Sequence, residues 1–353
     1  MLLRVSAVEP FVVNVGGRSF EEIAEGGGRN GRLWTALRKR TSARFVSAGE
    51  FSGRRAGVRV AEITPGTSSS RTIQMGGDIP ITVVIPVKNE ERNLPRCLAA
   101  LSRFAEMIVV DSGSTDKTQE IARQAGARLI EFRWDGRYPK KRNWVLINHR
   151  LANEWVLFLD ADEFVDDQFC NEVAAAIASD RHNGYWLNYT NYFLGRRLKY
   201  GVPQRKLALF RVGSGLYERI DENHWSTLDM EVHEHPIIEG SVGEIRAPME
   251  HNDFRGIERF LDRHRDYARW EARRILLFER MGGPEGVQLT ARQRFKYRNL
   301  TSWWYPWFYF LYAYVAKLGL LDGAAGFHYA FYKSWYFLTI RLMARKLRNT
   351  GDV

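Results

Sequence analysis

The stretch Ile81-Thr82-Val83-Val84-Ile85-Pro86-Val87-Lys88-Asn89-Glu90 decides how this 353-residue chain folds. Its first half is a run of β-branched residues, which is typical of a strand buried on both faces in a parallel sheet. Its second half begins with Pro86 and soon turns polar, so the strand gives way to a loop there. We therefore expect folded structure to begin at Ile79, with this strand at its centre.

Strand and helix patterns alternate at short intervals after this stretch. Apolar runs predict three more strands, and helical periodicity and capping residues predict four helices between them. The strands are expected at 107–110, 127–132 and 154–159, and the helices at 90–104, 115–124, 140–151 and 166–178, with Thr115 as an N-cap. Such alternation predicts an α/β, Rossmann-like fold, with a mostly parallel sheet and helices on both faces.

The composition divides the chain into three parts. Residues 1–77 are rich in Gly, Arg and Ser and lack periodicity, so we predict a disordered extension, of which residues 1–74 are dispensable for folding. Residues 78–251 carry the alternating pattern and then a strand-rich region at 185–248, and form the predicted α/β domain. Residues 252–353 contain an amphipathic helix at 257–278 and a very aromatic end.

Charge and cysteine content narrow the classes of function. The net charge of +11 suits an anionic surface or an anionic substrate. No helix-turn-helix, RRM or finger pattern accompanies it, so we expect no nucleic-acid partner. The two cysteines, Cys97 and Cys170, form no C-x-x-C pair. Neither a zinc knuckle nor a disulfide framework is expected, and a reducing compartment is indicated.

Polar residues follow three of the predicted strands where each one ends, at 86–91, 111–116 and 160–163. Because ligands bind outside the carboxyl ends of parallel strands, these segments are expected to build one site. Asp160 and Asp162 form a D-x-D pair directly after an apolar run. Two such carboxylates favour a hard divalent cation, Mg²⁺ or Mn²⁺, held beside substrate phosphates.

The three segments resemble the motifs of family-2 glycosyltransferases of GT-A fold. The family pattern is roughly V-V-I-P-x-x-N-E, then V-V-D-D-G-S-T-D-x-T, then L-D-A-D, and residues 83–90, 109–118 and 159–162 match it in order and spacing. Ser112 stands where the family often has a second Asp, which leaves Asp111 as the nucleobase contact. The resemblance implies a nucleotide-sugar donor, UDP-linked.

The same resemblance implies the roles of the donor-site residues. Asp111 would accept a hydrogen bond from uracil, while Pro86, Val87 and Glu90 would shape the base and ribose pocket. Arg142 would lie beside the diphosphate or the base, although a solvated helix start is the alternative for it. Asp160 and Asp162 would face the ribose and the metal.

Later motifs resemble bacterial lipooligosaccharide core β-1,4-glucosyltransferases, so that the resemblance spans roughly residues 80–340. They are Leu209-Phe210-Arg211, Val232-His233-Glu234 and Gly319-Leu320-Leu321-Asp322-Gly323. This resemblance implies an inverting hexosyltransferase that extends a lipid-linked glycan, such as a lipopolysaccharide core. The alternatives are a polyprenyl-phosphate glycosyltransferase and a non-catalytic, membrane-bound interaction protein of the same fold.

Inverting transfer needs a carboxylate near the acceptor hydroxyl as general base. Glu234 is the first candidate, and Asp221, Glu222 and Asp229 are its rivals. The alternative for Glu234 is a structural carboxylate paired with an Arg or His. His251 is expected to complete the metal shell with Asp160 and Asp162, and a neutral histidine that only packs is the alternative.

The C-terminal segment is uncharged and aromatic at 303–312, and Arg341, Arg345, Lys346 and Arg348 follow it. Trp and Tyr favour the membrane–water interface, and basic residues favour anionic leaflets. Because the apolar runs are too short to span comfortably, we predict interfacial or re-entrant helices. These would hold the enzyme in the cytoplasm, at the inner face of the cell membrane. The alternative is a helical subdomain packed on the sheet or on a second subunit.

Overall fold

The computed structural model describes residues 78–220, 222, 225–232, 234–253, 256–282 and 289–351. The predictions made for residues 1–77 and for Asp221 lie outside these ranges. The three-part division of the chain therefore stays a prediction at its N-terminal end.

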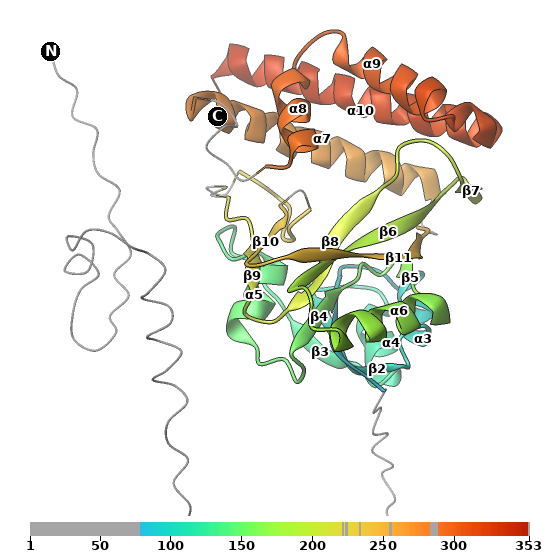
Figure 1. The fold of residues 1–353 in the computed structure, drawn as a ribbon. Coiled ribbons are helices and arrows are strands. Elements are labelled where there is room, and N and C mark those ends of the chain that lie inside the picture. Colours follow the sequence, from blue (N-terminus) through green and yellow to red (C-terminus); the bar gives the residue numbers. More distant parts are fainter. Residues whose placement is uncertain are drawn as a thin grey trace, which may run out of the picture. The chain divides into compact units, whose positions relative to one another are not determined.

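A nine-stranded mixed sheet forms the centre of the described part of the chain (Figure 1). Its strand order is β3-β2-β1-β4-β8-β6-β11-β5, and β7 pairs with β6. The bounds are β1 Ile79–Val87, β2 Phe104–Asp111, β3 Arg128–Glu131, β4 Trp155–Phe158, β5 Glu163–Phe164, β6 Gly184–Phe193, β7 Arg196–Leu198, β8 Arg205–Arg211 and β11 Val242–His251. A separate pair consists of β9 Gly215–Tyr217 and β10 Pro236–Ile238.

The predicted parallel arrangement is confirmed in the first half of the sheet. β1 lies between β2 and β4 and runs parallel to both, with Val84 opposite Ile108 on one side and Phe158 on the other. Its apolar residues are fully buried on both faces, as the β-branched run predicts. The strand-rich region after residue 184 adds antiparallel neighbours, since β8 runs antiparallel to β4 and to β6.

Four helices connect the parallel strands, and two of them begin later than predicted. Their bounds are α3 Leu94–Ala99, α4 Thr118–Gln124, α5 Lys141–Asn148 and α6 Asp167–Ala178. The first helix is short because Pro95, which has no N–H to donate, lies in its first turn and Phe104 already belongs to β2. Thr115 is not the N-cap of α4; its N–H donates to the side chain of Asn89 at 2.8 Å instead.

The loops after β1 and β2 are tied together by several such bonds. The N–H of Asn89 donates to Ser114 Oγ at 2.8 Å, and the N–H of Glu90 donates to Thr118 Oγ1 at 2.8 Å. The polar residues that follow both strands are therefore spent partly on holding one loop against the other. This fixes the direction in which Pro86 and Glu90 leave the sheet.

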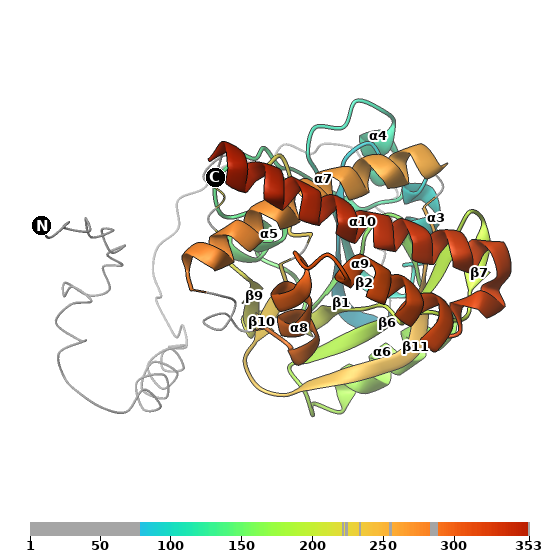
Figure 2. The same cartoon turned by 90° about the horizontal axis from the view of Figure 1, so that it is seen from above.

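The C-terminal helices form a layer of their own above the sheet (Figures 1 and 2). They are α7 Gly256–Arg280, α8 Ala291–Asn299, α9 Tyr305–Leu311 and α10 Gly323–Thr350, with a π-helical turn at Tyr312–Ala316 and a 3₁₀ turn at Gly319–Asp322. Their buried side chains make a second apolar core that includes Ile275, Tyr305, Phe337 and Ile340. The segment is thus a helical subdomain, as the alternative prediction had it.

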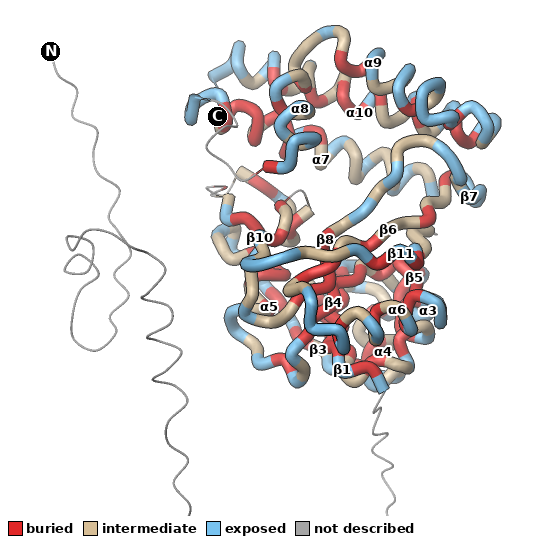
Figure 3. Tube along the Cα trace, in the orientation of Figure 1, coloured by how far each residue is buried: buried red, intermediate tan, exposed pale blue. Residues whose placement is uncertain are grey.

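Asp322, in the last of the predicted motifs, joins this layer to the sheet. Its two carboxylate oxygens accept the N–H groups of Lys199 and Tyr200 at 3.0 and 2.9 Å, just after β7. Burial alternates along α10, whose inner side packs while its outer side is exposed (Figure 3). Among the described residues, no helix is both long and apolar enough to cross a membrane.

Candidate active site

A cavity of about 770 Å³ lies between the carboxyl ends of β1 and β4, the β6–β7 hairpin and the helices α7 and α10. One end is acidic and is lined by Glu90, Asp160, Asp162, Glu163 and Asp253. The other end is aromatic and is lined by side chains of α7 and α10. The sheet edge at which the sequence places a ligand site is therefore hollow.

Five of the nine predicted site residues line this cavity. They are Pro86, Glu90, Asp160, Asp162 and His251. The first four come from neighbouring parallel strand ends, as expected. His251 arrives from far along the chain because the end of β11 pairs with the turn after β4, which places His251 opposite Glu163.

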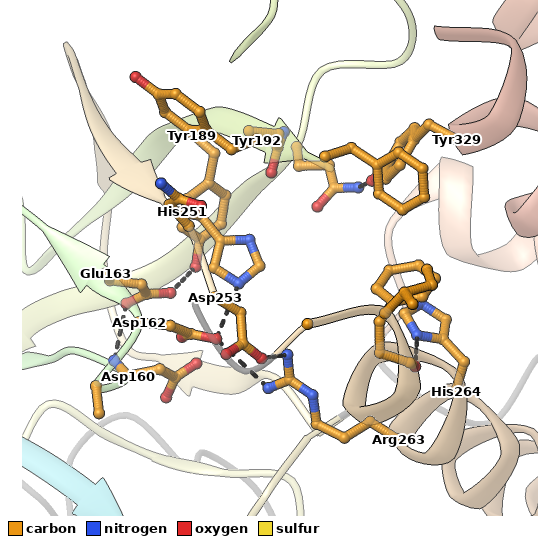
Figure 4. Close-up of a pocket in the computed structure, with 18 of the residues that line it drawn as sticks. Asp160, Asp162, Glu163, Tyr189, Tyr192, His251, Asp253, Arg263, His264 and Tyr329 are labelled. Atoms are coloured by element: carbon orange, nitrogen blue, oxygen red, sulfur yellow. Dashed lines mark hydrogen bonds and ion pairs between the residues drawn. The ribbon is translucent and has the colours of Figure 1, made fainter. Parts of the chain in front are cut away.

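Asp162, His251 and Arg263 meet at the acidic end (Figure 4). Asp162 is almost fully buried, and its Oδ2 lies 3.5 Å from His251 Nε2 and 3.4 Å from Arg263 Nη1. Arg263 also donates to Asp253 at 2.6 Å. Burial alone would lower the pKa of His251, but the Asp162 carboxylate outweighs it and raises that pKa above its usual value.

Asp160 faces two other cations. Its Oδ1 accepts Arg142 Nη2 at 2.6 Å, and its Oδ2 lies 3.8 Å from Lys206 Nζ. Burial by itself would raise the pKa of Asp160, but Lys206 and Arg142 outweigh it, so the pKa is lowered and the carboxylate is charged. The predicted Arg142 thus reaches the site through Asp160, without lining the cavity itself.

Glu163 is a site residue that the predicted set lacks. It is buried, accepts the Tyr189 hydroxyl and the Lys206 ammonium, and receives the N–H of Asp160 at 2.9 Å. Lys206, Arg263 and Asp253 were missed as well. Only Glu163 carried a signal, its place beside the D-x-D pair; the others come together through strand pairing and through α7.

The acidic end fits a divalent cation in part. Two ligands about 2.1 Å from one ion are separated by about 3–3.5 Å, and Asp162 Oδ2 and His251 Nε2 are 3.5 Å apart. The third predicted ligand, Asp160, points to Arg142 and Lys206. Among the described residues, no group of three or more His, Cys, Asp or Glu side chains is arranged to hold a metal ion.

Val87, Asp111, Arg142 and Glu234 do not line the cavity. Asp111 is fully buried, and its carboxylate accepts the N–H of Ser114 at 3.0 Å and the Gln119 side chain at 2.7 Å. It holds the turn after β2 in this structure, and its contact with a base stays a prediction.

Glu234 lies in a separate buried cluster of charges. Its Oε1 accepts Lys140 Nζ at 2.7 Å, and its Oε2 accepts the N–H of Val232 at 3.0 Å. Lys140 also pairs with the rival candidate Glu222, while Asp229 pairs with Lys141 at 3.2 Å. The cationic partner is thus a lysine, where the structural alternative named an Arg or His. Val232 lines the main cavity, so Glu234 lies close behind its wall.

Comparison with known proteins gives a consistent family. Residues 82–231 match the sequence model described as glycosyl transferase family 2. The lipopolysaccharide core biosynthesis glycosyltransferase LpsC of Rhizobium meliloti is 32% identical over 183 residues, which are 48% of this chain and 61% of that protein. An uncharacterized glycosyltransferase of Rickettsia typhi is 34% identical over 30% of this chain and 35% of its own. The chain thus spans about a third to three fifths of the length of these relatives.

Among solved structures, S. aureus TarS in complex with UDP-GlcNAc aligns over 77% of this chain and 92% of its own, with a TM-score of 0.37 and 17% identity. Glucosyl-3-phosphoglycerate synthase from Mycobacterium tuberculosis, in complex with Mn²⁺ and UDP, aligns over 33% of this chain and 44% of its own, with a TM-score of 0.25 and 23% identity.

Proposed function

Because residues 82–231 make up a glycosyl transferase family 2 domain, we propose that the protein transfers a hexosyl group, with inversion, from a UDP-sugar to a growing lipid-linked glycan. The observation that carries this proposal is the gathering of Asp160, Asp162 and His251 with Pro86 and Glu90 around one cavity at the ends of β1 and β4. The name of the R. meliloti relative supports a lipopolysaccharide core as the acceptor.

The proposed donor lies at the acidic end, with its diphosphate toward Asp162. Asp162 and His251 would hold a divalent cation there, joined by Asp160 once it leaves Arg142. Such an ion supplies positive charge that stabilises a departing diphosphate. Arg142, Lys206 and Arg263 already surround these carboxylates. Each guanidinium or ammonium freed by the ion would add a charged donor for phosphate oxygens.

Glu234 remains our proposed general base, and Asp253 is its competitor. Glu234 is separated from the cavity by the wall that includes Val232, and it would have to exchange Lys140 for the acceptor hydroxyl. Asp253 lines the cavity already but is bound to Arg263 and to Asn93. Both carboxylates are therefore engaged in this structure, and kinetics must separate them.

We further propose that the outer face of the helical layer rests on an anionic membrane surface. This face carries an exposed row of large apolar side chains, with Trp303 70% and Trp307 61% exposed. Others in the row are Leu311, Val315, Leu321 and Phe331. Exposed apolar patches of this kind mark interaction surfaces, and Trp is favoured at the membrane interface.

The two sides of α10 support this arrangement. Tyr329 and Lys333 line the cavity, whereas Phe331 and Trp335 are exposed. Successive helical residues are about 100° apart, so residues two positions apart lie on nearly opposite sides. One helix would thus face the membrane and the cavity at once, which would bring a lipid-linked acceptor close to the donor.

The proposal is tested by incubating purified protein with a panel of UDP- and GDP-sugars, with Mn²⁺, Mg²⁺ or EDTA, and measuring binding and nucleotide release. Core oligosaccharide and polyprenyl phosphate are offered as acceptors in parallel. Transfer to the oligosaccharide from one UDP-sugar supports the proposal. Transfer to polyprenyl phosphate alone favours the alternative enzyme, and absence of nucleotide-sugar binding favours an interaction protein.

A further inference from the structure

The aromatic end of the cavity contains a basic group that donor binding does not use. Figure 4 shows His264 and Tyr329 at the side opposite Asp160, Asp162 and Glu163, with Arg263 between them. Lys333 lines this end from α10. Among the described residues, no carboxylate lies within ion-pair distance of its ammonium, although Arg263 is held by Asp162 and Asp253.

Lys333 is held by rings and by one histidine. Its Nζ lies 3.3 Å from His264 Nε2 and 5.9 and 5.7 Å from the ring centres of Tyr329 and Tyr336. His264 Nδ1 lies 2.9 Å from the carbonyl oxygen of Phe260. Since a carbonyl only accepts, Nδ1 carries the proton, and Nε2 of the neutral ring accepts from Lys333.

An ammonium has three N–H donors, and His264 takes one of them. Burial, with Lys296 and Arg263 nearby, lowers the pKa of Lys333 to about 8. The amine is therefore charged at neutral pH but lacks a compensating anion. The Tyr336 hydroxyl is also buried, and it has no hydrogen-bond partner among the described residues. Unpaired polar groups of this kind are costly in a merely structural wall.

Resting on the proposed function, we propose that this end of the cavity is the acceptor subsite, and that Lys333 binds an anionic group, a phosphate monoester or a carboxylate, on the acceptor sugar. The donor's diphosphate belongs to the acidic end, where the cation ligands are. A second anion-binding position at the opposite end therefore serves a different molecule. The rings of Tyr329 and Tyr336 around Lys333 supply flat apolar faces of the kind that line sites for organic ligands.

The test is isothermal titration of the purified full chain at pH 7 with glucose 6-phosphate, glucuronate and glucose, in the presence and absence of UDP and Mn²⁺. We expect one of the two anionic sugars to bind at least about tenfold more tightly than glucose, since charge-assisted hydrogen bonds are the strong ones. UDP should leave that binding in place. Whether the phosphate or the carboxylate binds more tightly identifies the group.

Three variants make the result specific. Lys333→Met should lose the preference for the anionic sugar, Lys333→Arg should keep it, and Lys199→Met should match wild type, because Lys199 is exposed and does not line the cavity. Melting curves confirm that each variant folds. Equal affinity for glucose and both anionic sugars, or full displacement by UDP, overturns the subsite. UDP binding is measured in the same titrations, so a failure of the donor site is recognised separately.

Discussion

Arg263 on α7 and Asp162 after β4 face each other at 3.4 Å, although 101 residues separate them. The guanidinium holds the same carboxylate oxygen that lies 3.5 Å from His251 Nε2. The helical layer thus reaches into the centre of the proposed donor site. In the absence of a divalent cation, Arg263 is the group that balances the buried charge of Asp162.

We predict that Asp162→Asn nearly abolishes turnover while the protein still folds. Loss of one electrostatic group at a developing charge costs about 3–4 kcal/mol of barrier, or roughly 10²–10³-fold in kcat. Folding should survive because Arg263 keeps Asp253 as a partner at 2.6 Å. Steady-state rates and melting curves check this, with Asp167→Asn as control, since Asp167 is highly exposed. Wild-type rates in saturating Mn²⁺ or Mg²⁺ would remove Asp162 from the site.

Glu234→Gln is predicted to lower kcat about 10²–10⁴-fold while the Kd for the donor is unchanged, because a general base acts on the acceptor. Lys140→Met is the matched variant, since it removes the partner of Glu234 and leaves the carboxylate. If both variants lose activity and melting temperature together, Glu234 holds the fold and is not the base. Asp253→Asn is then the variant in which the kcat loss should appear.

The stability of the protein should rise between about pH 8 and pH 10.5 through Lys333. Burial lowers the folded-state pKa of Lys333 to about 8, so in this window the unfolded chain binds the proton more tightly. The cost of burying the charge is fully present below pH 8 and disappears as pH rises. Its upper limit is about 3 kcal/mol. Denaturant unfolding at several pH values checks this, and Lys333→Met should flatten the rise. Parallel curves for the two proteins would contradict it.

Membrane binding is predicted to depend on Arg345 and Lys346 together with the aromatic face. Each basic residue near an anionic surface contributes about 1 kcal/mol, so replacing both by Glu should weaken binding to phosphatidylglycerol vesicles by more than tenfold. Arg348 is left in place because it pairs with Glu279 at 3.0 Å through Nε. The control reverses Lys117 and Arg123, exposed on the sheet domain. Equal sedimentation of the two double variants at low salt would exclude the electrostatic contribution, and no binding by wild type would exclude the membrane.

The sequence by itself determined the parallel half of the sheet and the acidic strand ends. The β-branched run of β1 and the apolar run of β4 specify buried strands, because no other element buries such runs on both faces. Parallel strands place their carboxyl ends at one edge, so Pro86, Glu90, Asp160 and Asp162 were predicted together from local pattern alone. The aromatic C-terminal segment was likewise visible as a surface that prefers an apolar neighbour.

Only the tertiary structure decided which cations meet these carboxylates. Arg263, Lys206 and Lys333 carry no local signal, since each stands in an element whose charged residues are mostly exposed. They reach the cavity because β8 pairs with β4, and because α7 and α10 pack over the sheet. The same long-range packing placed Glu234 beside Lys140, 94 residues away. The partner of a charge depends on contacts between distant segments, and burial makes those contacts strong because the interior screens charges poorly. Neither is encoded in the spacing of residues along the chain.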